Sequence, residues 1–259
     1  MSLDHLALLG AAQDDFLALL RDADPTTQVP WCGDWTVREM AVHLADIHHW
    51  AAGQARREQE TPLETSAPDV VELYGRCAAE LRATLRALPA HASAWTLIGD
   101  GTVDFWHRRQ LHETLVHLWD LRVALALAGS GDMSPRVGGV GVRAPAGAPV
   151  PRFDPAWARP MVAEAWDDTV DEVVTVMHPR QVRLGRCPAL PATIHLVATD
   201  TGRRWTLEHA SAAPSAEVAG PAAALALLLW RRVLPQDPAL QVTGDRSALD
   251  AALALRLTP

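Results

Sequence analysis

Apolar residues recur at helical spacing in four long segments of the first half of the chain. The pattern predicts helices over residues 3–22, 37–57, 70–88 and 103–128. Thr36 and Glu39 form a capping-box pattern before the second segment, and Asp69 is expected to cap the third. Gly129 suits the end of the fourth segment. We therefore expect a mainly α N-terminal bundle of four main helices.

The hydrophobic period changes in the last third of the chain. Residues 129–154 are rich in Gly, Pro and Ala and are predicted to be a loop or linker. Pro155 suits the first turn of a further helix, which should end before Pro179. Later stretches predict strands at 193–198, 204–208, 215–218 and 240–243, and helices at 221–233 and 247–255. We expect two domains, a helical bundle at 1–178 and a smaller α+β domain at 179–259.

Composition narrows the classes of protein to which the chain can belong. The formal net charge is −8 and the basic residues are not clustered, so we expect no binding to nucleic acid. All 23 basic residues are arginine. Without lysine, neither an internal Schiff base to pyridoxal phosphate nor a Walker-type phosphate loop can form. Lys and Asn are both absent, which indicates a GC-rich genome such as that of an actinobacterium.

We expect no segment in this sequence to direct the protein to or across a membrane. No window is long and apolar enough to span a bilayer, and the first residues lack a basic segment ahead of an apolar stretch. The three cysteines form no CxxC pair. We expect no membrane interaction and a cytoplasmic protein with reduced thiols.

Six of the 11 histidines fall in the second and fourth predicted helices. Glu113 and His117 are four residues apart and share a helix face, while His43 lies in the inward stripe of the second helix. Such groups are costly on inward faces unless they pair or bind metal. Two histidines, one carboxylate and an open position are typical of catalytic zinc. The alternatives are a hydrogen-bonded core histidine and a surface Glu–His pair. His112 and His117 are one residue too far apart for the HExxH motif of zinc peptidases.

Two stretches of sequence carry a family resemblance. VPWCGDWTVREMAVHL (residues 29–44) and RRQLHETLVHLWD (residues 108–120) resemble the W-T-V-x-x-L-x-x-H-L and R-x-x-x-H-E-x-x-x-H-x-x-D segments of mycothiol-dependent maleylpyruvate isomerases with DinB-like N-terminal domains. The resemblance implies that His43, Glu113 and His117 bind one divalent metal ion. We expect zinc, although these ligand types also suit nickel or another borderline ion.

The resemblance also implies an activity. It indicates a DinB-like four-helix bundle with a smaller α+β domain, and an enzyme with mycothiol as its cosubstrate. A thiolate held by the metal would attack a small electrophilic substrate, giving either cis–trans isomerisation or S-transfer. The alternative is a non-catalytic or regulatory metal-binding module. The sequence names neither the electrophile nor the oligomeric state.

Four further residues could contribute to the site or to the binding of substrate and cosubstrate. Arg232 is the best match to a functionally important arginine in the family's C-terminal domain, although Arg231 adjoins it. Arg109 could pair with a substrate carboxylate or with the sugar of the thiol, or could be solvated. Asp120 either orients a ligand histidine or forms a surface salt bridge. Cys32 precedes a helix N-terminus, where the pKa of a thiol can fall, so it is either a packing residue, which we favour, or a nucleophile.

Overall fold

A computed structural model describes residues 3–64, 69–129, 152–158, 161–208 and 214–259. The chain divides into two compact units, Met1–Gly138 and Gly139–Pro259. Each unit has its own core and is described by itself. Within the described residues, no helix combines the length and the apolar character needed to cross a membrane.

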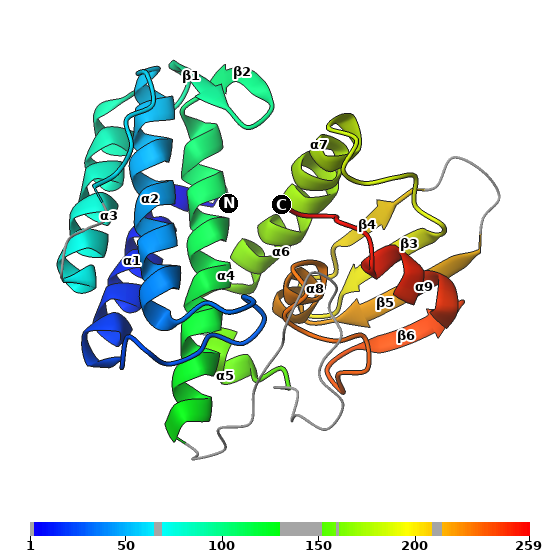
Figure 1. Ribbon diagram of the computed structural model, residues 1–259. Coiled ribbons are helices and arrows are strands. Elements are labelled where there is room, and N and C mark those ends of the chain that lie inside the picture. Colours follow the sequence, from blue (N-terminus) through cyan, green and yellow to red (C-terminus); the bar gives the residue numbers. More distant parts are fainter. Residues whose placement is uncertain (1–2, 65–68, 130–151, 159–160, 209–213) are drawn as a thin grey trace. The chain divides into compact units, whose positions relative to one another are not determined.

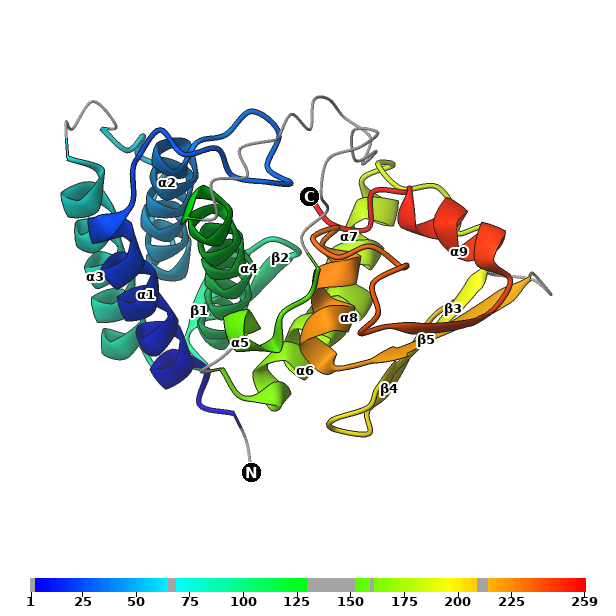
Figure 2. The same ribbon diagram turned by 90° about the horizontal axis from the view of Figure 1, so that it is seen from below.

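Four long helices form the first unit. They are α1 (His5–Asp22), α2 (Val37–Arg56), α3 (Val70–Ala87) and α4 (Asp104–Gly129). Helices α1 and α2 each pack against both α3 and α4, so the four lie side by side as a bundle (Figures 1 and 2). The predicted mainly α four-helix bundle is confirmed.

The predicted caps of α2 and α3 are present. The Thr36 hydroxyl accepts a hydrogen bond from the amide of Glu39 at 3.4 Å, and the Thr36 amide donates to Oε2 of Glu39 at 2.6 Å. The Asp69 carboxylate accepts from the amides of Val71 and Glu72. Each cap satisfies amides that have no partner inside the helix, and the first anchors the helix that carries His43.

A short hairpin precedes α4, between the third and fourth predicted helices, where we expected no strand. Strand β1 (Ser93–Thr96) pairs antiparallel with β2 (Gly99–Thr102). Four-residue strands, one of them with two glycines, are too short to give an alternating hydrophobic pattern.

A mixed four-stranded sheet in the order β4–β3–β5–β6 organises the second unit (Figure 1). Its strands are β3 (Thr193–Ala198), β4 (Arg204–Leu207), β5 (Ser215–Gly220) and β6 (Gln241–Gly244). Strand β3 runs antiparallel to β4 and parallel to β5, and β5 runs antiparallel to β6. Helix α8 (Ala222–Leu229) is buried along its whole length and contacts β3 and β5, and α9 (Arg246–Leu253) contacts β5. The predicted smaller α+β unit is confirmed.

The helical segment before this sheet is longer than predicted. After the short α5 (Pro155–Ala158), helix α6 (Ala163–Glu172), a π-helical turn (Val173–Met177) and α7 (His178–Arg183) follow one another without a break. The prediction that the helix ends before Pro179 was wrong. Pro179 lies in the first turn of α7, where the wider π-helical turn accommodates a residue that has no amide hydrogen.

The boundary between the units also differs from the expected one. We expected it after residue 178, whereas the structure groups Gly139–Pro259 together. The reason is that α6 packs against α8 and therefore belongs with the sheet. The predicted loop or linker at 129–154 lies almost entirely outside the described residues.

Candidate metal centre

The three predicted metal ligands lie together in the first unit. His43 comes from α2, and Glu113 and His117 lie one turn apart on α4. Oε1 of Glu113 is 3.3 Å from Nε2 of His43 and 3.4 Å from Nε2 of His117. One donor atom from each residue lies within 4.8 Å of the other two. Their convergence was expected from the helical spacing, and their role as ligands stays a prediction.

The spacing of these donor atoms fits a tetrahedral ion. Ligand atoms bound at about 2.0–2.1 Å to zinc with tetrahedral angles stand about 3.3 Å from one another. The two distances to Oε1 of Glu113 match this separation. Two imidazole nitrogens and one carboxylate oxygen suit zinc and other borderline ions, and they leave a fourth position for a water or a substrate.

Arg109 neutralises the carboxylate of this centre. Its guanidinium forms a buried ion pair with Oε2 of Glu113, the oxygen that does not face the histidines. Burial raises the pKa of Glu113, but the charge of Arg109 and hydrogen bonds from His117 and His43 outweigh it and hold the pKa well below its usual range. Glu113 is therefore ionised, with one oxygen paired and the other directed at the imidazoles. The predicted alternative of a solvated Arg109 does not fit its burial.

Asp120 holds the ring of His117. Nδ1 of His117 is 3.1 Å from Oδ2 of Asp120, and Asp120 is 1% exposed, so the alternative of a surface salt bridge does not fit. Burial lowers the pKa of His117, but hydrogen bonds with Asp120, Cys32 and Glu113 raise it further, and the pKa lies well above its usual value. A carboxylate that accepts from Nδ1 leaves Nε2 as the ligand atom, the arrangement common behind metal-binding histidines.

Cys32 lies closer to this site than its predicted packing role implied. Its Sγ donates to Oδ2 of Asp120 at 3.4 Å. Cys32, His117 and Asp120 form a second group whose possible ligand atoms lie within 4.8 Å of one another. The sequence signal that could have found it is the position of Cys32 in the loop just before the capping box of α2. The members of the second group already hydrogen-bond to one another, with Oδ2 of Asp120 contacting both Sγ of Cys32 and Nδ1 of His117, so we favour the His43 group.

The exposed fractions place the open side of the centre next to His43. The His43 side chain is 31% exposed, against 10% for Glu113 and 8% for His117. The ring of Trp35 lies 4.8 Å from that of His43 and 6.4 Å from that of His117, measured between centroids. Of the three side chains, that of His43 is therefore the most accessible to solvent.

The two candidate arginines of the second unit differ in their contacts. Arg231 has a left-handed backbone (φ 61°), and its guanidinium donates to the carbonyl oxygens of Ala254 and Leu255. Arg232 follows α8 and donates to the carbonyl oxygen of Trp230 at 2.8 Å. Arg231 therefore ties the end of α8 to the end of α9, which favours Arg232 as the functional residue. That role stays a prediction.

Comparisons with known proteins agree with this architecture. The chain matches the family models "Mycothiol maleylpyruvate isomerase N-terminal domain" at residues 6–122 and "MDMPI C-terminal domain" at residues 156–251. A crystal structure of a mycothiol-dependent maleylpyruvate isomerase aligns over 92% of this chain and 91% of its own, with 12% identity and a TM-score of 0.56. A histidine-to-alanine mutant of the same description aligns with the same coverage, 14% identity and a TM-score of 0.53.

At these identities the likeness to the solved structures shows a shared fold. A search of the curated proteins finds no match. The two family models together span most of the sequence and correspond to the two units of the structure. The chain therefore belongs to the mycothiol-dependent maleylpyruvate isomerase family.

Proposed function

We propose that this chain is a metal-dependent isomerase that uses mycothiol as its cosubstrate, with His43, Glu113 and His117 as the protein ligands of the metal. The observation that carries the proposal is the spacing of their donor atoms, 3.3 and 3.4 Å from Oε1 of Glu113. Membership of the family supports the thiol and the class of reaction.

The charges around the centre suit a thiolate. A bound zinc ion would supply a positive charge that keeps a coordinating thiol deprotonated near neutral pH. The negative charge of Glu113 is balanced by Arg109, and an imidazole must give up its extra proton to bind the ion, so the two ligand imidazoles would add no charge. The positive charge of the ion is thus left to stabilise the sulfur of the cosubstrate.

The reaction needs an electrophilic double bond and a sulfur nucleophile. The thiolate adds to one carbon of the double bond, and the electron pair of that bond moves onto the conjugated carbonyl oxygen of the substrate as an enolate. The bond between the two carbons is now single and rotates, and the enolate pair then returns to re-form the double bond and expel the same sulfur. The ring of Trp35 lies beside that of His43 and would give the open side of the centre an apolar wall. Arg232 positions an anionic group of the substrate or cosubstrate. If the enolate instead takes up a proton from water at carbon, the adduct is released as a thioether and the same addition gives S-transfer.

The test is an assay of the purified full chain with maleylpyruvate and mycothiol. We expect about one equivalent of metal per chain, consumption of maleylpyruvate only when mycothiol is present, and loss of both metal and activity in His43→Ala. Analysis of the product by NMR distinguishes an isomer from a thioether. Metal-containing protein that binds mycothiol and leaves maleylpyruvate unchanged would refute the isomerase, and protein that binds no mycothiol would support a non-catalytic metal-binding module.

A further inference from the structure

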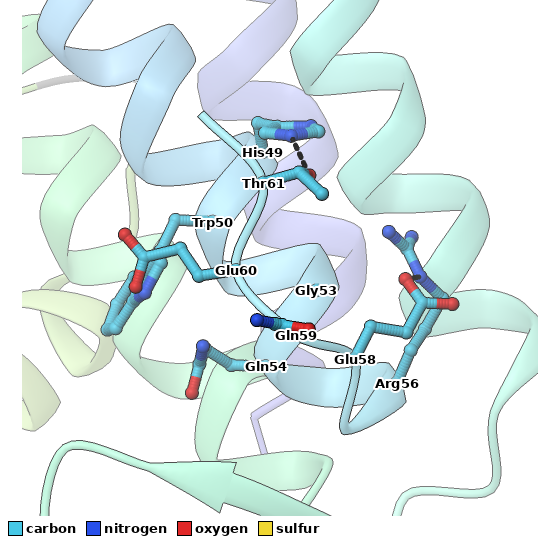
Figure 3. A pocket seen from close by; sticks show the side chains of 9 residues that line it. All are labelled: His49, Trp50, Gly53, Gln54, Arg56, Glu58, Gln59, Glu60 and Thr61. Carbon is cyan, nitrogen blue, oxygen red and sulfur yellow. Dashed lines mark hydrogen bonds and ion pairs between the residues drawn. The ribbon is translucent and has the colours of Figure 1, made fainter. Parts of the chain in front are cut away.

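A polar cavity lies beside the C-terminal half of α2, in the same unit as the metal centre (Figure 3). Its volume is about 210 Å³. The lining residues come from α2 and from the segment that follows it: His49, Trp50, Gly53, Gln54, Arg56, Glu58, Gln59, Glu60 and Thr61. None of them belongs to the candidate metal centre.

A pinned segment forms one wall of this cavity. The chain reverses at Arg57, which has a left-handed backbone (φ 58°), and residues 58–61, here called the strap, return alongside α2 (Figure 3). At one end of the strap, Glu58 pairs with Nε of Arg56 at 2.5 Å. At the other end, Oγ1 of Thr61 is 3.2 Å from Nε2 of His49. Because both ends are held, the wall between them is a defined surface.

The floor of the cavity is a glycine inside a helix. Gly53 lies in the last turn of α2, where glycine is a poorer helix former than alanine. A Cβ atom added there would meet nothing within 4 Å. Packing therefore does not require a glycine at this position, and its missing side chain leaves the space open.

The lining offers an aromatic ring and unused polar groups. The indole of Trp50 is held edge-on against Trp106, with 5.1 Å between the ring centroids. The side chains of Gln54, Gln59 and Glu60 make no hydrogen bond or ion pair within the part of the chain that the structure describes. Carboxamides donate and accept, and carboxylates accept from hydroxyls, while an indole packs against the C–H groups of a saturated ring. This combination suits a ring that carries several hydroxyl groups.

The cavity and the metal centre share a face of α2. His43, Ile47, Trp50 and Gln54 follow the spacing i, i+4, i+7 and i+11, which places them in one stripe along the helix. At about 1.5 Å per residue, Trp50 stands roughly 10 Å along the axis from His43. A ligand with its sulfur at the centre could therefore extend along this stripe and place a distant group in the cavity.

We propose that this cavity binds a hydroxylated ring of mycothiol, whose cysteine is joined through an amino sugar to inositol. The inference rests on the proposed function and adds the site that recognises the part of the cosubstrate remote from sulfur. The volume supports a single ring, because pockets that enclose whole drug-sized ligands measure about 300–1,000 Å³. The cavity thereby discriminates mycothiol from simple thiols that lack such rings.

Calorimetric titration of the zinc-loaded full chain with mycothiol and with N-acetylcysteine tests this assignment. N-acetylcysteine carries the thiol without the rings. Gly53→Leu fills the cavity, Gly53→Ala is the matched control because its single added carbon meets nothing, and Gln54→Ala removes a polar group of the lining. We expect Gly53→Leu and Gln54→Ala to weaken the binding of mycothiol about tenfold, the effect of losing one or two hydrogen bonds. Zinc content, N-acetylcysteine binding and the Gly53→Ala variant should match the wild type.

Two results would overturn the assignment of the ring site to this cavity, and a third would overturn the proposed function on which it rests. Equal affinity of the wild type for the two thiols would show that the rings are not recognised. Wild-type affinity for mycothiol in both Gly53→Leu and Gln54→Ala would place the ring site elsewhere. If zinc-loaded wild type binds neither thiol, the proposed function itself fails.

Discussion

The buried carboxylate of Asp120 lies 3.1 Å from Nδ1 of His117, on the edge of the ring opposite the nitrogen that faces Glu113. This hydrogen bond selects the tautomer of His117 in which Nε2 has a free lone pair. It also fixes the direction in which that lone pair points. Arg109 does the same for Glu113, because it occupies one carboxylate oxygen and leaves the other for the centre.

Loss of the Asp120 charge should weaken metal binding. We expect Asp120→Asn to lower zinc affinity by roughly 10–100-fold, the usual effect of removing the carboxylate behind a ligand histidine. Competition with a chromogenic chelator measures this affinity. Asp15→Asn is the control, since the partly exposed Asp15 of α1 pairs with Arg122 of α4 and belongs to neither possible ligand group. Equal zinc affinity in Asp120→Asn and wild type would contradict the positioning role.

Removal of Arg109 should destabilise the metal-free protein most. Arg109→Gln leaves Glu113 buried without its partner, which typically costs about 3–5 kcal/mol. A bound zinc ion would partly replace the lost positive charge. We therefore expect a large drop in thermal stability without zinc and a smaller drop with it, measured by calorimetry. Arg82→Gln, which removes a more exposed pair with Asp14, should cost less than about 1 kcal/mol in either state. Equal losses for Arg109→Gln with and without zinc would argue against a metal at Glu113.

Cys32 belongs to only one of the two possible ligand groups, so a cobalt spectrum can show which group binds the metal. If the His43 group binds the metal, cobalt-substituted protein should show no thiolate-to-cobalt absorption band until mycothiol is added. Cys32→Ser should bind the same amount of cobalt and should gain the same band with mycothiol. A band present before any thiol is added, and absent in Cys32→Ser, would instead assign the metal to the group of Cys32, His117 and Asp120.

His48 should make the protein sensitive to acid. It is fully buried, its Nδ1 is 2.7 Å from Oε1 of Gln110, and burial lowers its pKa from 6.5 to about 4. As the pH falls, the unfolded chain protonates His48 at a higher pH than the folded chain does. The stability that neutral His48 contributes is therefore complete above pH 6.5 and is lost as the pH falls toward 4. The loss amounts to about 3 kcal/mol. His48→Asn, which keeps a donor near Gln110, should unfold with a shallower dependence on pH between 6.5 and 4 in urea titrations. Identical slopes for variant and wild type would contradict this account.

Much of the fold and the core of the site followed from the sequence. The capping box at Thr36 and the apolar stripe of α2 placed His43 on an inward face, and the spacing of Glu113 and His117 placed both on one face of α4. Periodicity carries such information because the helix repeat is regular. Periodicity says less about which face of α4 is inward, because every residue from Arg109 to Leu121 is buried and no side of that stretch is exposed.

The remaining features depend on contacts that no local pattern records. Cys32 reaches Asp120 from a loop 88 residues away in the sequence. The ion pair of Arg109 with Glu113 is buried, which the spacing of the two residues along the helix does not show, and the predicted binding role of Arg109 stays a prediction. The helix continues through Pro179 because a π-helical turn precedes it, and such turns have no simple sequence signature. The Gly53 cavity arises from the return of the strap along α2.

The most direct test of the central claim is a crystal structure of the zinc-loaded protein with anomalous data collected at the zinc edge. The account predicts one peak about 2.0–2.2 Å from Nε2 of His43, Nε2 of His117 and Oε1 of Glu113. A peak bound by Cys32 and Asp120 instead, or no peak between α2 and α4, would contradict it.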